Sequence, residues 1–220
     1  MLEGAYTAER TAALAGVPWS TVHFWAREGI VVPSISPVRV KLWSYTDLLA
    51  LRTVHWLRHD KVTRDGTPIP GTSMRKVKAA LKQLRKLDAD LFDSQHRSAI
   101  CVDPSGEVLL APEQHPAQWL NGQLVFDGAI DVVAPFQSAE SVVGPDLVAP
   151  RPWVRIHPQR LSGATHVLGT RIETEALFRL QQRGFDEDRV VWLYPEIRPE
   201  ALDDAIRLEQ QLDRNRRAAA

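Results

Sequence analysis

The N-terminal part of the chain places apolar residues with the period of two short helices. An apolar run over residues 12–17 is broken at Gly16, and apolar positions return three residues apart at Val22 and Trp25. Pro18 suits the first turn of the second helix, and a glycine commonly ends the first. The pattern predicts a helix-turn-helix, the arrangement that places its second helix in the major groove of DNA.

The side of the second helix opposite its apolar residues carries groups suited to reading nucleic acid. Ser20, His23, Phe24 and Arg27 follow one another at i, i+3, i+4 and i+7 spacing and therefore share one face. This face combines hydrogen-bonding groups, a fixed cation and an aromatic ring. Trp19 adds an indole at the start of the helix, where a phosphate or base contact is within reach.

Residues 29–33 and 38–43 predict a two-stranded wing around a proline-rich turn. Arg39 and Lys41 are two residues apart, so they would point to the same face of a strand and suit backbone phosphates. A merely solvated hairpin is the alternative interpretation. The residues expected to contact DNA are Trp19, Ser20, Thr21, His23, Arg27, Arg39 and Lys41.

Two further helices are predicted before residue 90. Ser44 and Asp47 form a capping-box pattern at the start of the first, and residues 61–71 are expected to form a loop. Residues 72–87 then predict an amphipathic helix whose other faces are rich in lysine and arginine. We expect it to pack on the domain, with an auxiliary role in phosphate contact.

Beyond residue 97 the hydrophobic period becomes that of strands. Residues 99–102 and 108–110 predict one hairpin, and Asn121-Gly122 predicts a second turn before a strand near residues 130–133. Residues 135–152 are rich in proline and glycine and are expected to form a linker or an extended arm.

The C-terminal segment predicts two short strands and three helices. The strands are expected at 154–158 and 165–168, and the helices at about 174–183, after Asp186, and from Pro199 towards Leu212. The last helix carries acidic groups that would repel phosphate, namely Glu200, Asp203, Asp204 and Glu209. This half therefore suits protein binding or dimerisation better than DNA binding.

The net charge of zero hides an asymmetry between the two ends of the chain. Residues 1–90 hold 14 Lys and Arg against 8 Asp and Glu, whereas residues 91–220 hold 13 against 19. A basic N-terminal part and an acidic C-terminal part favour different partners for each. Ordinary fluctuation of composition is the alternative explanation.

No pattern in the chain indicates catalysis, a cofactor or a metal. Gly-rich phosphate loops are absent from the sequence, and its one cysteine, Cys101, is expected to be a small buried apolar residue. His55 and His59 lie at i, i+4 spacing, but a zinc site would need a third ligand from elsewhere. No apolar run is long enough to cross a membrane, so we expect a soluble cytoplasmic protein that is not an enzyme.

Residues from Tyr6 to about His59 resemble the MerR-type winged helix-turn-helix. The matching segments are Ala12 to Val17, Ser20 to Gly29, and Leu42 to Leu48. The resemblance implies that the helix after Pro18 reads bases and that the wing grips phosphates.

Residues from about Ile156 to Leu212 resemble a second family, a small helix-turn-helix domain common in VapB-type antitoxins. The matching residues are Ile156-His157-Pro158, Gly163, Gly169-Thr170-Arg171-Ile172, Gly184-Phe185-Asp186 and Tyr194-Pro195. Longer antitoxins of this kind are thought to neutralise a PIN-type ribonuclease toxin and to repress their own operon. The resemblance implies a partner-binding role for Gly169, Thr170, Arg171 and Tyr194.

Together these patterns predict an α+β protein of three parts. Residues 1–90 would form a winged helix-turn-helix, 91–150 a β-rich module with a linker, and 151–220 a three-helix domain that binds a toxin or dimerises. We hypothesise an antitoxin that binds operator DNA as a homodimer and neutralises a ribonuclease toxin, with no cofactor. A ligand-responsive MerR-like regulator and a protein-interaction scaffold without DNA binding are the alternatives.

Overall fold

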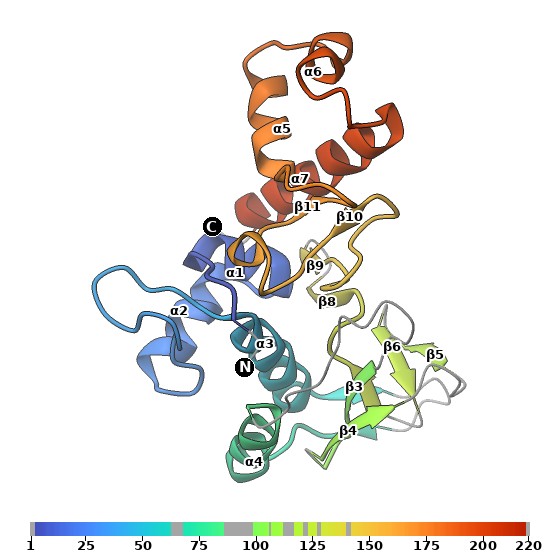
Figure 1. The fold of residues 1–220 in the computed structure, drawn as a ribbon. Coiled ribbons are helices and arrows are strands. Elements are labelled where there is room, and N and C mark those ends of the chain that lie inside the picture. The colour runs from blue at the N-terminus through green and yellow to red at the C-terminus, as the bar shows by residue number, and fades with distance from the viewer. Residues whose placement is uncertain are drawn as a thin grey trace.

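The computed structural model describes residues 3–62, 68–85, 99–105, 107–111, 117–120, 123–126, 129–139 and 142–218. Its α-helices are α1 (Ala8–Ala15), α2 (Trp19–Arg27), α3 (Tyr45–Arg58), α4 (Met74–Leu84), α5 (Thr174–Gln182), α6 (Glu187–Leu193) and α7 (Pro199–Ala218). Its strands are β1 (Lys61–Val62), β2 (Pro68–Ile69), β3 (Ala99–Val102), β4 (Val108–Ala111), β5 (Ala117–Leu120), β6 (Gln123–Phe126), β7 (Ala129–Asp131), β8 (Phe136–Ala139), β9 (Val142–Gly144), β10 (Val154–Arg155) and β11 (His166–Val167). Helices and small antiparallel sheets confirm the α+β class (Figure 1).

Helices α1 and α2 form the expected helix-turn-helix. The Thr7 hydroxyl accepts a hydrogen bond from the Arg10 amide and caps α1, and Gly16 ends it in the left-handed conformation. Pro18 lies just before α2 rather than inside its first turn, because its ψ of 139° is extended. Val22 and Trp25 are buried, as the spacing predicts.

Helices α3 and α4 complete the N-terminal part of the chain, which we call the head (residues 3–85). Ser44 and Asp47 form the complete capping box at the start of α3. The apolar stripe of α4 is buried, while the last residues of the predicted helix, Lys86 and Leu87, lie outside the described residues. The expected loop over 61–71 is corrected in part, because its two ends pair as the antiparallel strands β1 and β2.

The central module is a five-stranded antiparallel sheet in the order β4-β3-β7-β6-β5. The two predicted hairpins are confirmed, since β3 pairs with β4 and β5 pairs with β6. The turn residues Asn121 and Gly122 lie outside the described residues. The predicted strand at 130–133 is shorter and shifted, because β7 ends at Asp131.

Residues 135–152 are not a linker. They contain the hairpin of β8 and β9, and Phe136 and Leu147 are buried in the core. Proline and glycine give this segment the composition of a linker, yet buried side chains hold it in place. The guanidinium of Arg52 on α3 donates to the carbonyl of Pro145 within the segment at 2.6 Å and to that of Ala134 just before it at 2.6 Å.

The C-terminal part, which we call the tail (residues 151–218), begins with the short pair β10 and β11 and continues with α5, α6 and α7. Gly184 follows α5 with a φ of 86°, and Asp186 caps α6, as the sequence predicts. Helix α7 extends to Ala218, beyond the expected end near Leu212.

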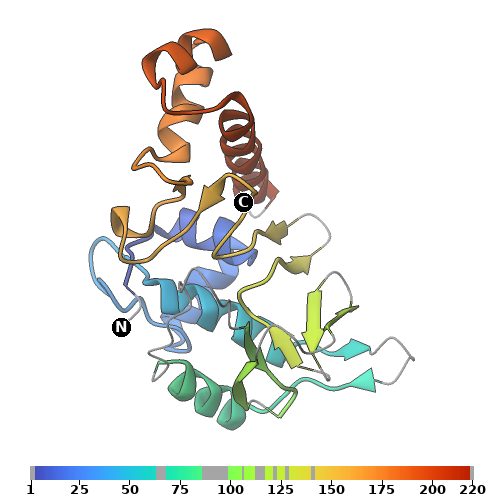
Figure 2. The same ribbon diagram turned by 45° about the vertical axis from the view of Figure 1, so that its right-hand side comes forward.

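Helix α7 runs back to the head and packs on α1 (Figures 1 and 2). The Asn215 side-chain amide donates to the carbonyls of Ala13 at 3.0 Å and Val143 at 2.7 Å. Buried apolar residues of head, hairpin and tail form one continuous cluster. The three-part division of the chain stays a prediction, but its first and last parts share a core.

One acidic residue of α7 plays a different part from the one the sequence suggests. Glu209 does not face solvent, where it would repel phosphate; its side chain is only 1% exposed and pairs with Arg10 of α1 at 2.6 Å. No helix in the described part of the chain is both long and apolar enough to cross a membrane.

Candidate nucleic-acid interface

Most of the outer face of α2 is exposed to solvent. Trp19 is 42% exposed and Phe24 46%, and Ser20 is also exposed. Arg27 ends the face with a side chain that is 71% exposed and lies 5.6 Å from the Phe24 ring. The helix therefore presents one hydroxyl, two aromatic rings and one cation, while Thr21 is half-buried.

His23 is more enclosed than its helical position suggests. Its ring lies 4.2 Å from the Trp19 ring and 6.2 Å from the Trp43 ring, centroid to centroid. Burial lowers the pKa of His23, and the charge of Lys41 lowers it further, so the imidazole is neutral at pH 7. Its Nε2 atom is buried without a hydrogen-bond partner among the described residues. His23 is thus a half-buried side chain that carries no fixed charge.

The wing is a loop and not a two-stranded ribbon. The described pairing within the wing is one isolated bridge, in which the Leu42 amide donates to the Ser36 carbonyl at 2.9 Å. Prolines 33 and 37 remove two amide donors, and Arg39 has a φ of 58°, which no strand residue adopts. The expectation that Arg39 and Lys41 share a strand face is therefore wrong, although Arg39 is exposed and Lys41 is half-buried at the tip.

The base of this wing loop is fixed to α3. The Asp47 carboxylate accepts hydrogen bonds from the Ser44 amide and from both the amide and the hydroxyl of Ser34, all at 2.8–2.9 Å. Ser34 belongs to the wing loop, so the capping box of α3 also anchors the wing. The apolar tip beyond it is open to solvent, with Val38 71% and Val40 64% exposed.

Helix α4 adds a cationic face next to α2 that is not among the predicted contact residues. Its exposed cations are Arg75, Lys76, Lys78 and Lys82, followed by Arg85, and α4 contains no acidic residue. A cleft of about 560 Å³ joins the end of α2 to this helix, with Phe24, Arg58 and Lys78 in its lining. The sequence shows the recurring lysine and arginine residues of α4, but it does not show that α4 lies beside α2.

The turn between α1 and α2 is held by buried groups. Arg52 is fully buried and donates to the carbonyls of Leu14 at 2.8 Å and Ala15 at 3.1 Å, which α1 itself leaves without partners. At Gly16 a Cβ atom would lie 2.3 Å from the Gly144 nitrogen, so only glycine fits. The orientation of α2 therefore depends on α3 and on the β9 strand.

A buried ion pair fixes the tail to α1. Arg10 donates to both Glu209 carboxylate oxygens, at 2.6 and 2.8 Å, and the hydroxyls of Thr165 and Thr174 also donate to Glu209. Burial alone would raise the pKa of Glu209, but the hydrogen bonds and charge of Arg10, with the two hydroxyls, hold it below its usual value. Glu209 is therefore ionised at neutral pH.

The predicted partner-binding residues do not form one cluster. Gly169, Thr170 and Arg171 form a turn before α5, in which the Thr170 amide donates to the Val167 carbonyl at 3.0 Å. Tyr194 ends α6, beyond the opposite end of α5 (Figure 1). Gly169 and Arg171 are exposed, and Thr170 and Tyr194 are half-buried. Their partner-binding role stays a prediction.

One histidine of α3 and the histidine that follows this helix form a ring stack. His55 and His59 have centroids 4.0 Å apart and an interplanar angle of 20°. Among the described residues no group of three or more His, Cys, Asp or Glu is arranged to hold a metal ion.

Two family models match separate parts of the chain. Residues 6–66 match the MerR HTH family of regulatory proteins, which confirms the MerR-type helix-turn-helix of the head. Residues 154–207 match a family of proteins of unknown function, DUF433. This second match carries no activity, so the resemblance of the tail to VapB-type antitoxins stays a prediction. No curated protein and no solved structure matched the chain.

Proposed function

We propose that this protein is a transcription regulator that binds double-stranded DNA through its head. The observation that carries the proposal is the MerR-type helix-turn-helix whose second helix presents an exposed, acid-free face from Trp19 to Arg27. The wing cations and the cationic face of α4 both follow α2 in the sequence and supply positive charge. Phosphate contacts from such groups position a recognition helix, and its side chains read the bases.

The roles within this surface follow from exposure and chemistry. Ser20 and Thr21 carry hydroxyls able to bond base edges, and His23 brings a neutral ring nitrogen near them. Arg27, Arg39 and Lys41 bond phosphates, and the Trp19 indole packs against the sugar-phosphate backbone. Binding as a homodimer would place two such helices about one DNA turn apart, so the operator is expected to be a pseudo-palindrome.

Selection from a random DNA duplex library tests this proposal. Immobilised full-length protein should enrich one motif with two related half-sites, and a Ser20→Ala variant should relax the preference at one position of each half-site. Enrichment of no motif, with wild-type protein that remains folded by circular dichroism, would contradict sequence-specific binding.

We further propose that the regulator is the antitoxin of a toxin-antitoxin pair, repressing its own operon while the tail binds a PIN-type ribonuclease. The support is the tail's resemblance to VapB-type antitoxins and a surface remote from α2 that retains exposed apolar side chains, including Trp192. A ligand-responsive regulator remains the alternative, and the 560 Å³ cleft beside α2 favours it as a place for a small molecule.

Co-expression with the product of the adjacent gene separates the two. An antitoxin should co-purify with that product, restore growth when it is toxic, and suppress its RNA cleavage in a purified assay. If the ribonuclease still cleaves RNA at its full rate in an equimolar mixture with this protein, the antitoxin role is contradicted. The DNA-binding proposal would remain intact.

A further inference from the structure

The far end of the tail has an acidic surface that its own arginines balance only in part. Residues 186–204 hold seven Asp and Glu against two arginines, a net charge of −5. Both arginines lie over aromatic rings of the tail: Arg189 is 4.6 Å from the Phe185 ring and Arg198 is 5.2 Å from the Trp153 ring. We call this end, α6 with the adjoining ends of α5 and α7, the tail tip.

Trp192 is the exposed aromatic residue of the tail tip. It is 78% exposed, more than any other large apolar side chain in the described part of the chain, and Leu193 beside it is 41% exposed. Residues 188 and 192 are four apart on α6, so Trp192 and Asp188 share one face of the helix. The rings of Phe185 and Trp153 each hold an arginine, whereas Trp192 has no cation over it among the described residues.

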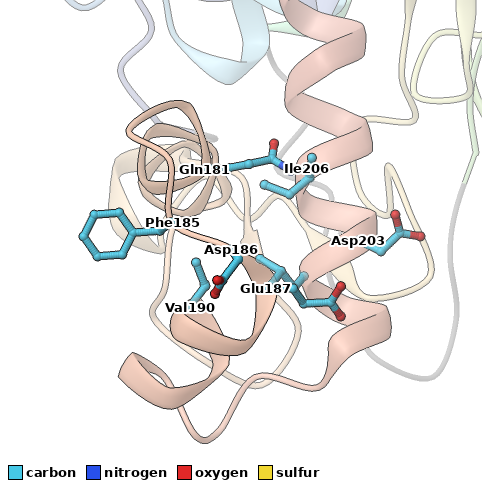
Figure 3. A pocket seen from close by; sticks show the side chains of 8 residues that line it. Gln181, Phe185, Asp186, Glu187, Val190, Asp203 and Ile206 are labelled. Carbon is cyan, nitrogen blue, oxygen red and sulfur yellow. The ribbon is translucent and has the colours of Figure 1, made fainter.

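A small groove lies on the other side of α6. It has a volume of about 230 Å³, enough to admit an apolar side chain, and an apolar floor that includes Val190, Leu202 and Ile206. Figure 3 shows the side chains around it, which come from α5, the start of α6 and α7. The charged groups in its lining are all acidic, namely Asp186, Glu187 and Asp203, and Asp203 also pairs with Arg207 in solvent at 2.9 Å.

We propose that the tail tip docks an arginine-rich segment of a second protein. A guanidinium stacks on the Trp192 indole and bonds the neighbouring carboxylates, while an apolar side chain of the same segment enters the groove. Arginine suits this position because it combines stacking on an aromatic ring with hydrogen bonds to carboxylates. Nucleic acid is excluded as the occupant by the negative charge. The inference rests on the proposed function in one respect, that the tail has a protein partner.

Labelled peptides provide the direct test with the full-length protein. The probe is a short amphipathic peptide of arginine and leucine, with two matched peptides in which glutamate or lysine replaces every arginine. Fluorescence anisotropy should show binding of the arginine peptide, weaker binding of the lysine peptide and none of the glutamate peptide. Absence of binding by the arginine peptide would overturn the proposal.

Variants of the tail tip locate the site. Trp192→Ala should weaken binding about fivefold or more, and Trp192→Phe should weaken it less because a ring remains. The double change Glu187→Gln with Asp188→Asn should also weaken binding, whereas Glu107→Gln with Glu173→Gln removes the same charge elsewhere and should not. Equal losses in both double variants, or no loss in Trp192→Ala, would overturn the proposal.

Two further measurements distinguish other occupants and the proposed function. Sedimentation equilibrium of the protein alone tests a second copy as the occupant, since the cations of α4 could meet the acidic tip of another chain. Self-association abolished by Trp192→Ala would overturn the assignment to a second protein. Trp192 lies in the tail tip and not in the head, so Trp192→Ala should bind DNA as the wild type does. If the wild type itself fails to bind DNA, that result contradicts the proposed function but not peptide docking at the tail tip.

Discussion

Replacing Arg52 by methionine should destabilise the whole head and loosen its DNA-reading helix. The guanidinium makes six hydrogen bonds to main-chain carbonyls, two from the end of α1, three from residues 132–134 and one from Pro145. Methionine retains much of the side-chain length but donates nothing. All six carbonyls would lose this donor in a site where the Arg52 side chain is fully buried.

The size of the effect follows from two opposing terms. A buried polar group left without its partner costs about 1–3 kcal/mol. The Val133 carbonyl keeps a bond from the Leu147 amide, so the other five carbonyls set a maximum of roughly 5–15 kcal/mol. Removing the guanidinium also removes the cost of burying its charge, which is large enough that burial lowers the pKa of Arg52 to about 10. We therefore expect a net loss of about 4 kcal/mol, equivalent to a fall in Tm of about 8–16 °C for a chain of this size.

Urea unfolding followed by circular dichroism measures this loss, with Arg58→Met as the matched control. Arg58 lies on the same helix but is exposed and donates to one carbonyl, that of Thr72 at 3.1 Å. Its replacement should cost less than about 1 kcal/mol. Equal unfolding free energies for the two variants would refute the assignment of Arg52 as the group that holds the α1–α2 turn.

Three other changes probe the buried groups around the interface. Gly16→Ala should lower the free energy of unfolding in urea by about 3 kcal/mol or more, because the new Cβ would overlap the backbone of β9. Gly29 has a similar left-handed φ but lies in open space, so Gly29→Ala should lower it by only about 1–2 kcal/mol. Equal losses in the two variants would contradict the steric explanation. Glu209→Gln should cost about 3 kcal/mol at pH 7 by leaving Arg10 unpaired. Because the folded-state pKa of Glu209 is lowered, the wild type should keep this advantage above its ordinary value of 4.5 and lose it as the pH falls further; a constant difference between the two proteins from pH 7 to pH 3 would contradict this. Cys101, whose pKa burial raises to about 12, should resist Ellman's reagent at pH 8 until the protein is unfolded, and fast labelling of the native protein would contradict its burial.

The local elements were predictable because short-range signals determine them. Gly16, the capping box at Ser44 and the cap at Asp186 each act within one helical turn, and all three occur where the sequence places them. Residues on the inner face of α2 were also predictable, since the helical period alone selects Val22 and Trp25 for burial.

The features that the sequence could not reveal depend on contacts between distant residues. Arg52 reads as one of many arginines on a basic part of the chain, and only the fold brings its carbonyl partners around it. From the sequence alone, Glu209 is interpreted as a surface residue, because Arg10, with which it forms a buried ion pair, lies 199 positions earlier in the chain. The prediction of a two-stranded wing was wrong for a local reason. Arg39 is in the left-handed conformation near two prolines, and the periodicity of apolar residues does not detect this.

The salt dependence of binding to the DNA upstream of this protein's own gene tests the central claim most directly. Fluorescence anisotropy should show tight, sequence-selective binding that weakens steeply with salt. The double variant Arg27→Ala with Lys41→Ala should reduce the slope of log K against log salt by about 1.8, because each phosphate that a side chain neutralises contributes about 0.9. The tail control Arg179→Ala with Arg207→Ala should leave the slope unchanged. Wild-type binding no tighter than to random DNA, or equal slopes for both double variants, would contradict the account.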